Sequence, residues 1–326
     1  MKLVELLKEK ATANQRRIVL PESSAPEIVE AAYQACTLGL CKPILVGSED
    51  IVKANCVARG IPEEGWYTLE DPENADLDQA AKDLCEVAKL DEMTARFMLE
   101  DPLYYAAMLV CTGRADGMVA GYIAETAEVI SVGMMTVGLK ESAGFPSSYF
   151  IMDIPGFQNG EDGMLVYADA GVTIDPSAEE LAQIAVQTAE SVSNLLGWEP
   201  RVAMLSCSTK GSASHDRIDK VIEACEIAHK LNPDLLLDGE MQADAAIVPA
   251  VAKKKIPGTS PVGGRANILV FPDLDAGNIA YKLTQRLTGG QAYGPLLQGF
   301  RKPVCDLSRG SSVEDIVGII AVAAAQ

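Results

Sequence analysis

Short apolar runs alternate with longer amphipathic stretches along most of this chain. The apolar runs at residues 18–21, 43–47, 117–120, 149–152, 202–205 and 268–271 are predicted to be strands, and the amphipathic stretches at 25–38, 178–196, 216–231, 278–287 and 313–325 are predicted to be helices. Strands that alternate with helices build a mostly parallel sheet with helices on both faces. Strands without polar alternation are buried on both sides, as such a sheet requires. The pattern therefore predicts an α/β protein with three-layer sheets.

The region from Tyr149 to Thr173 departs from this rhythm. Two apolar runs are joined there by residues 156–163, which are rich in glycine and polar residues and predict a hairpin. We expect this antiparallel element to begin a second α/β domain, inserted into the first, with a central cleft. The chain has 326 residues, enough for two such lobes. The predicted domains are 1–145 plus 295–326, and 146–294.

The composition excludes several kinds of partner. Lys and Arg total 27 against 46 Asp and Glu, and the resulting net charge of -19 repels nucleic acid and anionic membranes. The 8 cysteines form no Cys-x-x-Cys pair and there are 2 histidines, so reduced core cysteines and no metal site are expected. The first residues lack a signal-peptide core, and the apolar run at 316–325 is about half a membrane span. These features predict a cytoplasmic protein.

Residues 302–315, KPVCDLSRGSSVED, are the most informative stretch for chemistry. A strand that ends in Ser308, Arg309 and Gly310 presents a hydroxyl, a guanidinium and backbone N–H groups together, as an anionic acyl or phosphoryl group requires. Ser312 and Asp315 have the spacing of a capping box. Asp315 is therefore either a capping acid or a proton acceptor near Ser308 and Arg309, and both alternatives stay open.

Three further polar segments lie where doubly wound folds bind ligands, beyond strand-like runs. Residues 206–212, SCSTKGS, predict either a phosphate cradle or a polar turn before a helix. Residues 238–246, DGEMQADAA, offer carboxylates to a metal or to polar groups, or else begin a helix. Lys282 and Arg286 are one helical turn apart, so they either clamp an anion or form surface salt bridges.

Taken together, these segments resemble the phosphate acetyltransferase family, which interconverts acetyl-CoA plus phosphate with acetyl phosphate plus CoA. The resemblance runs nearly end to end and is carried by ADGMVAG at 115–121, SCSTKGS at 206–212, DGEMQADAA at 238–246, the segment 271–286 and DLSRG at 306–310. It implies a two-lobe α/β homodimer that needs no metal or other cofactor. Its implied ligands are CoA and acyl-CoA, phosphate and acyl phosphate, all of them substrates or products.

The resemblance also implies roles for individual residues. Asp315 corresponds to the base that takes the CoA thiol proton, Ser308 to the hydroxyl that stabilises the oxyanion, and Arg309 to the guanidinium that holds the phosphate. The residues that fall in substrate-binding segments are Ser206, Ser208, Thr209, Lys282, Arg286 and Tyr293. A thiol with a pKa of about 8.5 is mostly protonated at neutral pH, so a nearby carboxylate helps to form the thiolate.

The loop after the ADGMVAG motif departs from the family. Ala124 and Ser131 stand where the family has a histidine and an arginine, and a second family arginine falls near Cys85. Both arginines are associated with CoA or phosphate binding, and Glu125 adds a negative charge to the loop. Two lost charge-assisted contacts weaken CoA binding by orders of magnitude unless another cation, such as Arg114, compensates.

The resulting functional prediction is a phosphate acyltransferase, in the first place for acetyl groups, that acts by direct attack in a ternary complex. One alternative is transfer of another acyl group. The other is a catalytically weak paralogue that binds an acyl phosphate or a partner subunit without turnover.

Overall fold

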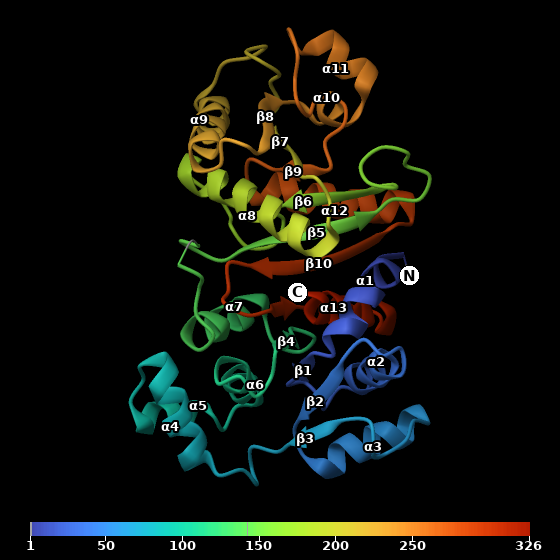
Figure 1. Ribbon diagram of the computed structural model, residues 1–326, viewed down its shortest axis with the longest axis vertical. Helices are drawn as coiled ribbons and strands as arrows, with labels where there is room; N and C mark the ends of the chain where they lie inside the picture. Colours follow the sequence, from blue (N-terminus) through green and yellow to red (C-terminus); the bar gives the residue numbers. More distant parts are fainter. Residues whose placement is uncertain (1, 142) are drawn as a thin grey trace. The chain divides into compact units, whose positions relative to one another are not determined.

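The computed structural model describes residues 2–141 and 143–326. The chain forms two compact units, Met1–Ser142 with Phe300–Gln326, and Ala143–Gly299 (Figure 1). The second unit is therefore inserted between the two segments of the first. The border expected between residues 294 and 295 falls inside one strand, β10 (Gln291–Gln298), and the second unit extends to the end of that strand.

The first unit is built on a five-stranded sheet in the order β11-β4-β1-β2-β3. The strands are β1 (Arg17–Leu20), β2 (Lys42–Val46), β3 (Thr68–Glu70), β4 (Gly117–Ala120) and β11 (Val304–Asp306). Every neighbouring pair is parallel, so all the carboxyl ends lie along one edge. Asp306 of β11 is in register with Ala120 of β4. The loops that follow these strands are therefore brought together.

Helices cover both faces of this sheet. They are α1 (Lys2–Asn14), α2 (Pro26–Thr37), α3 (Glu49–Arg59), α4 (Leu77–Ala88), α5 (Glu92–Met98), α6 (Pro102–Cys111), α7 (Thr126–Met135) and α13 (Val313–Ala325). Figure 1 shows α6 and α13 on opposite sides of β4 and β1, and α13 also packs against α1 and α2. Every residue from Ile316 to Ala325 is buried, which explains the apolar C-terminal run. Within residues 2–141 and 143–326, no helix has both the length and the apolar character needed to span a membrane.

The second unit contains a six-stranded mixed sheet in the order β10-β5-β6-β9-β7-β8. Its other strands are β5 (Ser147–Asp153), β6 (Met164–Ala168), β7 (Arg201–Leu205), β8 (Leu236–Met241) and β9 (Ile268–Val270). β5 and β6 are antiparallel, which confirms the predicted hairpin. β10 is antiparallel to β5, and the remaining pairs are parallel.

Helices also cover both faces of the second sheet. They are α8 (Ala178–Leu196), α9 (Asp216–Leu231), α10 (Ala243–Ile247), α11 (Pro249–Lys255) and α12 (Leu274–Thr288). Figure 1 shows α8 and α12 on opposite sides of the strands. One buried cluster joins Phe150, Tyr167 and Leu269 of the sheet to α10, and Tyr281 of α12 packs against it. The predicted α/β architecture, with helices on both faces of mostly parallel sheets, is confirmed in both units.

Candidate functional site

Ser308 and Arg309 lie on the loop between β11 and α13, and both are exposed. The loop is fixed at its start because the Leu307 N–H donates to the Ala120 carbonyl at 2.7 Å. It then turns back, because the Ser311 N–H donates to the Ser308 carbonyl at 2.9 Å. The hydroxyl and the guanidinium are thus held at the carboxyl edge of the first sheet, where α/β folds bind ligands.

Asp315 forms the capping box that the sequence predicts. Its Oδ2 atom accepts hydrogen bonds from the Ser312 N–H at 3.0 Å and the Ser312 hydroxyl at 2.9 Å. In return, the Asp315 N–H donates to Ser312 Oγ at 3.2 Å. Both accepted bonds use the same oxygen, so the cap does not occupy Oδ1. Capping and proton acceptance are therefore compatible in one carboxylate.

The loop after β4 approaches this segment through an ion pair. Arg309 Nη2 lies 3.0 Å from Glu125 Oε1, and the two side chains are 63% and 73% exposed. Glu125 is the N-cap residue of α7, but its side chain does not cap the helix. A pair this exposed is screened by water and contributes at most about 1 kcal/mol.

Two buried acids that the sequence analysis missed fix the same loop. Glu22 follows β1, is 7% exposed and accepts the N–H groups of residues 122–124 at 2.8 to 2.9 Å. Asp306 is fully buried at the end of β11 and accepts the Thr126 hydroxyl at 2.6 Å. The signal in the sequence that could have identified both acids is a charged residue at or just after the carboxyl end of an apolar strand.

The Asp306 carboxyl sits in an unusual environment. Burial raises its pKa to about 7, the charge of Glu22 adds to the rise, and the bond from Thr126 opposes it. Within the described residues, its Oδ1 atom has no hydrogen-bond partner. Gly121, with a φ of +101°, passes so close that a side chain there would meet this oxygen. The carboxyl is therefore packed against backbone on one side and bonded to Thr126 on the other.

We expect the buried Asp306 to make stability fall as the pH rises from about 4 to about 7. In that range Asp306 keeps a proton in the folded protein that the unfolded chain has already lost. Each unit of rise in pH therefore lowers the free energy of unfolding. Asp306→Asn should remove this contribution, which is at most about 4 kcal/mol. The measurement is urea denaturation of both proteins from pH 4 to pH 8.

Asp116 is a control, because its effect on the pH dependence of stability has the opposite sign. The hydrogen bonds and charge of Arg17 lower the Asp116 pKa, so its contribution is lost as the pH falls, and Asp116→Asn should flatten only the acid side. Superimposable pH profiles for wild type and Asp306→Asn would show that folding does not raise the pKa of Asp306.

In the second unit, the predicted phosphate cradle at residues 206–212 already contacts a protein carboxylate. The Ser208 hydroxyl and the Gly211 N–H both donate to Glu240 Oε1 at 2.8 Å. Ser208 and Thr209 are buried, Ser206 Oγ accepts the Ser208 N–H at 3.2 Å, and the Gln242 N–H donates to Thr209 Oγ1 at 3.0 Å. The segment is thus an ordered polar turn packed on β8.

The carboxylates of residues 238–246 bind polar groups, which was one of the alternatives. Asp238 and Glu240 lie within β8, whereas the other alternative, a helix N-terminus with an acid, is observed at the end of the segment, where α10 begins at Ala243 with Asp244 in its first turn. Asp238 pairs with Lys210, and Glu240 is bonded as described above. Within residues 2–141 and 143–326, no cluster of histidine, cysteine or acidic residues is suited to hold a metal ion.

The other candidate side chains of this unit have different surroundings. Lys282 and Arg286 are exposed on α12, and within the part of the chain that is described neither forms an ion pair, so the salt-bridge alternative is not observed. Lys282 Nζ lies 4.9 Å from the ring centre of Tyr281. Tyr293 is 3% exposed on β10, opposite Ile151.

The proposed compensating cation, Arg114, is already paired. Its Nη2 atom lies 2.9 Å and 3.0 Å from the two carboxylate oxygens of Glu70. Ser131 is exposed on α7, and Cys85 is half-buried on α4. Arg114 therefore does not offer a free positive charge.

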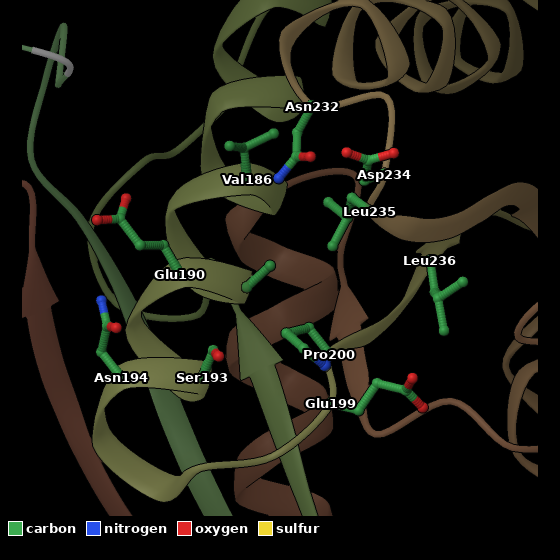
Figure 2. A pocket seen from close by; sticks show the side chains of 11 residues that line it. Val186, Glu190, Ser193, Asn194, Glu199, Pro200, Asn232, Asp234, Leu235 and Leu236 are labelled. Carbon is green, nitrogen blue, oxygen red and sulfur yellow. The ribbon is translucent and has the colours of Figure 1, made fainter.

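A hollow of about 530 Å³ lies elsewhere in the second unit, between α8 and the segments that lead into β7 and β8 (Figure 2). The carboxylates around it are Glu190, Glu199 and Asp234. Glu199 and Asp234 precede their strands, whereas α/β folds bind ligands beyond the carboxyl ends. Three acids also repel an anionic ligand. This hollow is therefore not the candidate site.

Comparisons with known proteins agree with one another. Residues 2–324 match the model of the family described as phosphate acetyl/butaryl transferase. The phosphate acetyltransferase of Thermoanaerobacterium thermosaccharolyticum is 45% identical, over 100% of this chain and 99% of its own length. That of Acetivibrio thermocellus is also 45% identical, over 100% and 98%. The crystal structure of a phosphotransacetylase from Streptococcus pyogenes has a TM-score of 0.92 and 43% identity, and covers 99% of this chain and 97% of that one.

Proposed function

Because this chain belongs to the phosphate acetyl/butaryl transferase family, we propose that it transfers an acetyl group between CoA and phosphate by direct attack in a ternary complex. The observation that carries the proposal is the β11–α13 loop. It holds Ser308 and Arg309 exposed at the carboxyl edge of the sheet and leads into α13, whose capping carboxylate is Asp315. CoA, phosphate and acetyl phosphate are then substrates and products, with no separate cofactor.

The proposed roles follow from the chemistry of each group. Asp315 accepts the proton of the CoA thiol, and the thiolate attacks the carbonyl carbon of acetyl phosphate. The Ser308 hydroxyl donates to the oxyanion that develops on the carbonyl oxygen. As the C–S bond forms, the C–O bond to phosphate breaks, and the planar Arg309 guanidinium holds the departing phosphate through two N–H groups. No bond to the enzyme is formed.

The other residues of the resemblance that belong to this proposal as substrate-binding groups are in the second unit. They are Ser206, Ser208, Thr209, Lys282, Arg286 and Tyr293. Lys282 and Arg286 support it best, because they are exposed cations one turn apart and make no ion pair within the described residues. A homodimer and a cytoplasmic location belong to the same proposal.

The charges of the loop after β4 favour the two alternatives, transfer of another acyl group and a catalytically weak paralogue. Ala124 and Ser131 carry no charge, Arg114 is paired with Glu70, and Glu125 is negative. Weak CoA binding, a different acyl group or a non-catalytic paralogue all follow from such a loop. Thiol release from acetyl-, propionyl- and butyryl-CoA, each with and without phosphate, separates them. We expect phosphate-dependent release that is fastest with acetyl-CoA; release without phosphate, or none with any acyl-CoA, would refute the proposed activity.

We expect Arg309→Lys to raise the KM for phosphate by about 10-fold or more. The ammonium is a point charge and cannot replace two parallel N–H bonds to phosphate oxygens. Arg96→Lys is the matched control, because Arg96 is also an exposed arginine paired with acids, Asp78 and Glu100. Equal KM values in the two variants would remove Arg309 from phosphate binding.

A further inference from the structure

The candidate phosphate-binding guanidinium already contacts an anion of the protein. Arg309 Nη2 lies 3.0 Å from Glu125 Oε1. Ser131 of the same segment carries no positive charge, and the negative charge of Glu125 faces Arg309.

The backbone on both sides of Glu125 is held in place. Ahead of it, the Ala124 N–H donates to buried Glu22 at 2.8 Å. Behind it, the Thr126 hydroxyl donates to buried Asp306 at 2.6 Å. Because the backbone of this segment is already ordered, only the rotamers of the Glu125 side chain lose freedom when it pairs, so the contact costs less entropy than one made from a mobile loop.

The partner arginine is fixed to the same sheet edge. Arg309 follows Asp306 by three residues, and the intervening Leu307 N–H donates to the Ala120 carbonyl at 2.7 Å. Ala120 ends β4, the strand from which the Glu125 loop starts. The two charges therefore come from neighbouring loops that share their anchors, and the pairing of β4 with β11 brings them together.

Glu125 also has the chemistry of a competitor. A carboxylate and a phosphate both offer oxygen atoms to the guanidinium N–H groups, so they seek the same donors. The two side chains of the pair are 63% and 73% exposed, so incoming phosphate reaches the pair from water. An exposed pair of this kind is weak enough for phosphate to displace. Competition from it should lower the binding constant for phosphate by a factor of about 1.4 to 5.

We propose that Glu125 occupies the Arg309 guanidinium as an internal anion and must be displaced by phosphate, so that it sets the affinity of this enzyme for phosphate and acyl phosphate. The inference rests on the proposed role of Arg309. It assigns to Glu125 control of affinity, and no part in the chemical step.

Glu125→Gln tests this with a side chain of the same shape and no charge. We expect the KM for phosphate and the Ki for sulfate, a non-transferable analogue, each to fall by about 2- to 5-fold, with a smaller change in kcat. The advantage of the variant should shrink at high salt, because salt screens the wild-type ion pair. Glu128→Gln is the control: it removes the same charge from the first turn of α7, and within the described residues Glu128 forms no ion pair.

The outcomes separate this inference from the proposed function. If wild type turns over acetyl-CoA and the two variants have the same phosphate KM, the inference is wrong and the function stands. If wild type shows no turnover, the proposed function falls, and calorimetric titration with phosphate still decides the inference. Tighter phosphate binding by Glu125→Gln than by Glu128→Gln then supports it, and equal binding overturns it.

Discussion

Asp315→Asn is expected to lower kcat by about 100-fold or more while the protein stays folded. Asparagine keeps an oxygen that can accept the Ser312 N–H, so the capping box can persist. It cannot accept the thiol proton, and loss of a general base typically lowers the rate by about 10²- to 10⁴-fold. The measurement is kcat for CoA-dependent cleavage of acetyl phosphate, alongside thermal unfolding.

Two controls separate the cap from the base. Ser312→Ala removes the partner of the cap and leaves Asp315 in place, so it should lower stability by about 1 kcal/mol with a smaller effect on kcat. Glu180→Gln neutralises the equivalent acid in the capping box of α8. If Asp315→Asn keeps its kcat and loses only as much stability as Glu180→Gln, Asp315 is a helix cap and another group accepts the proton.

Gly121→Ala is expected to destabilise the protein by about 2 kcal/mol or more and to lower kcat/KM at least about 10-fold. A φ of +101° already strains any residue with a side chain. A Cβ atom would also lie 2.8 Å from the Leu307 nitrogen and 2.9 Å from its oxygen. Backbone atoms cannot rotate away, so the segment that carries Ser308 must move.

Gly39→Ala isolates the steric part of that effect. Gly39 has a φ of +73° and no atom within 4 Å of a built Cβ, so alanine there adds backbone strain of about 1 kcal/mol and no collision. Urea denaturation and steady-state kinetics of both variants give the comparison. Equal losses of stability and full activity in Gly121→Ala would mean that the loop yields without displacing Ser308.

Local signals fixed much of the fold in advance. The helices expected at 178–196, 216–231 and 313–325 have those limits, because strong periodicity coincides with capping residues such as Ser177 and Ser312. The hairpin and the parallel strands also follow from local composition.

The two missed strands of the second unit have polar or irregular sequences. β8 contains Asp238 and Glu240, whose charges are compensated by Lys210 and Ser208 from another part of the chain. β10 contains the Gly294–Pro295 step, where its register with β5 shifts. Local patterning cannot reveal a strand whose polar groups are satisfied by distant partners.

The site shows the same division between local and distant information. Ser308, Arg309 and Asp315 stand in one short motif and are readable as a group. The acids that hold the loop after β4 cannot be recognised from the sequence in this way. Glu22 accepts hydrogen bonds from residues 100 to 102 positions away, and Asp306 accepts one from Thr126, 180 positions away. The pairing of Glu125 with Arg309 likewise requires β4 and β11 to be neighbours, which only the folded sheet establishes.

The first unit is built from two separate segments of the chain, and this has a consequence for biosynthesis. Phe300–Gln326 emerges from the ribosome only after the whole of Ala143–Gly299 has been made. Until then β4 lacks its neighbour β11, and the apolar faces of α1 and α2 lack α13. Until the last segment is made, the nascent first unit therefore exposes the unpaired edge of β4. Exposed strand edges are sites at which chaperones bind and chains associate wrongly. The loop with Ser308 and Arg309 is thus among the last parts of the unit to take shape.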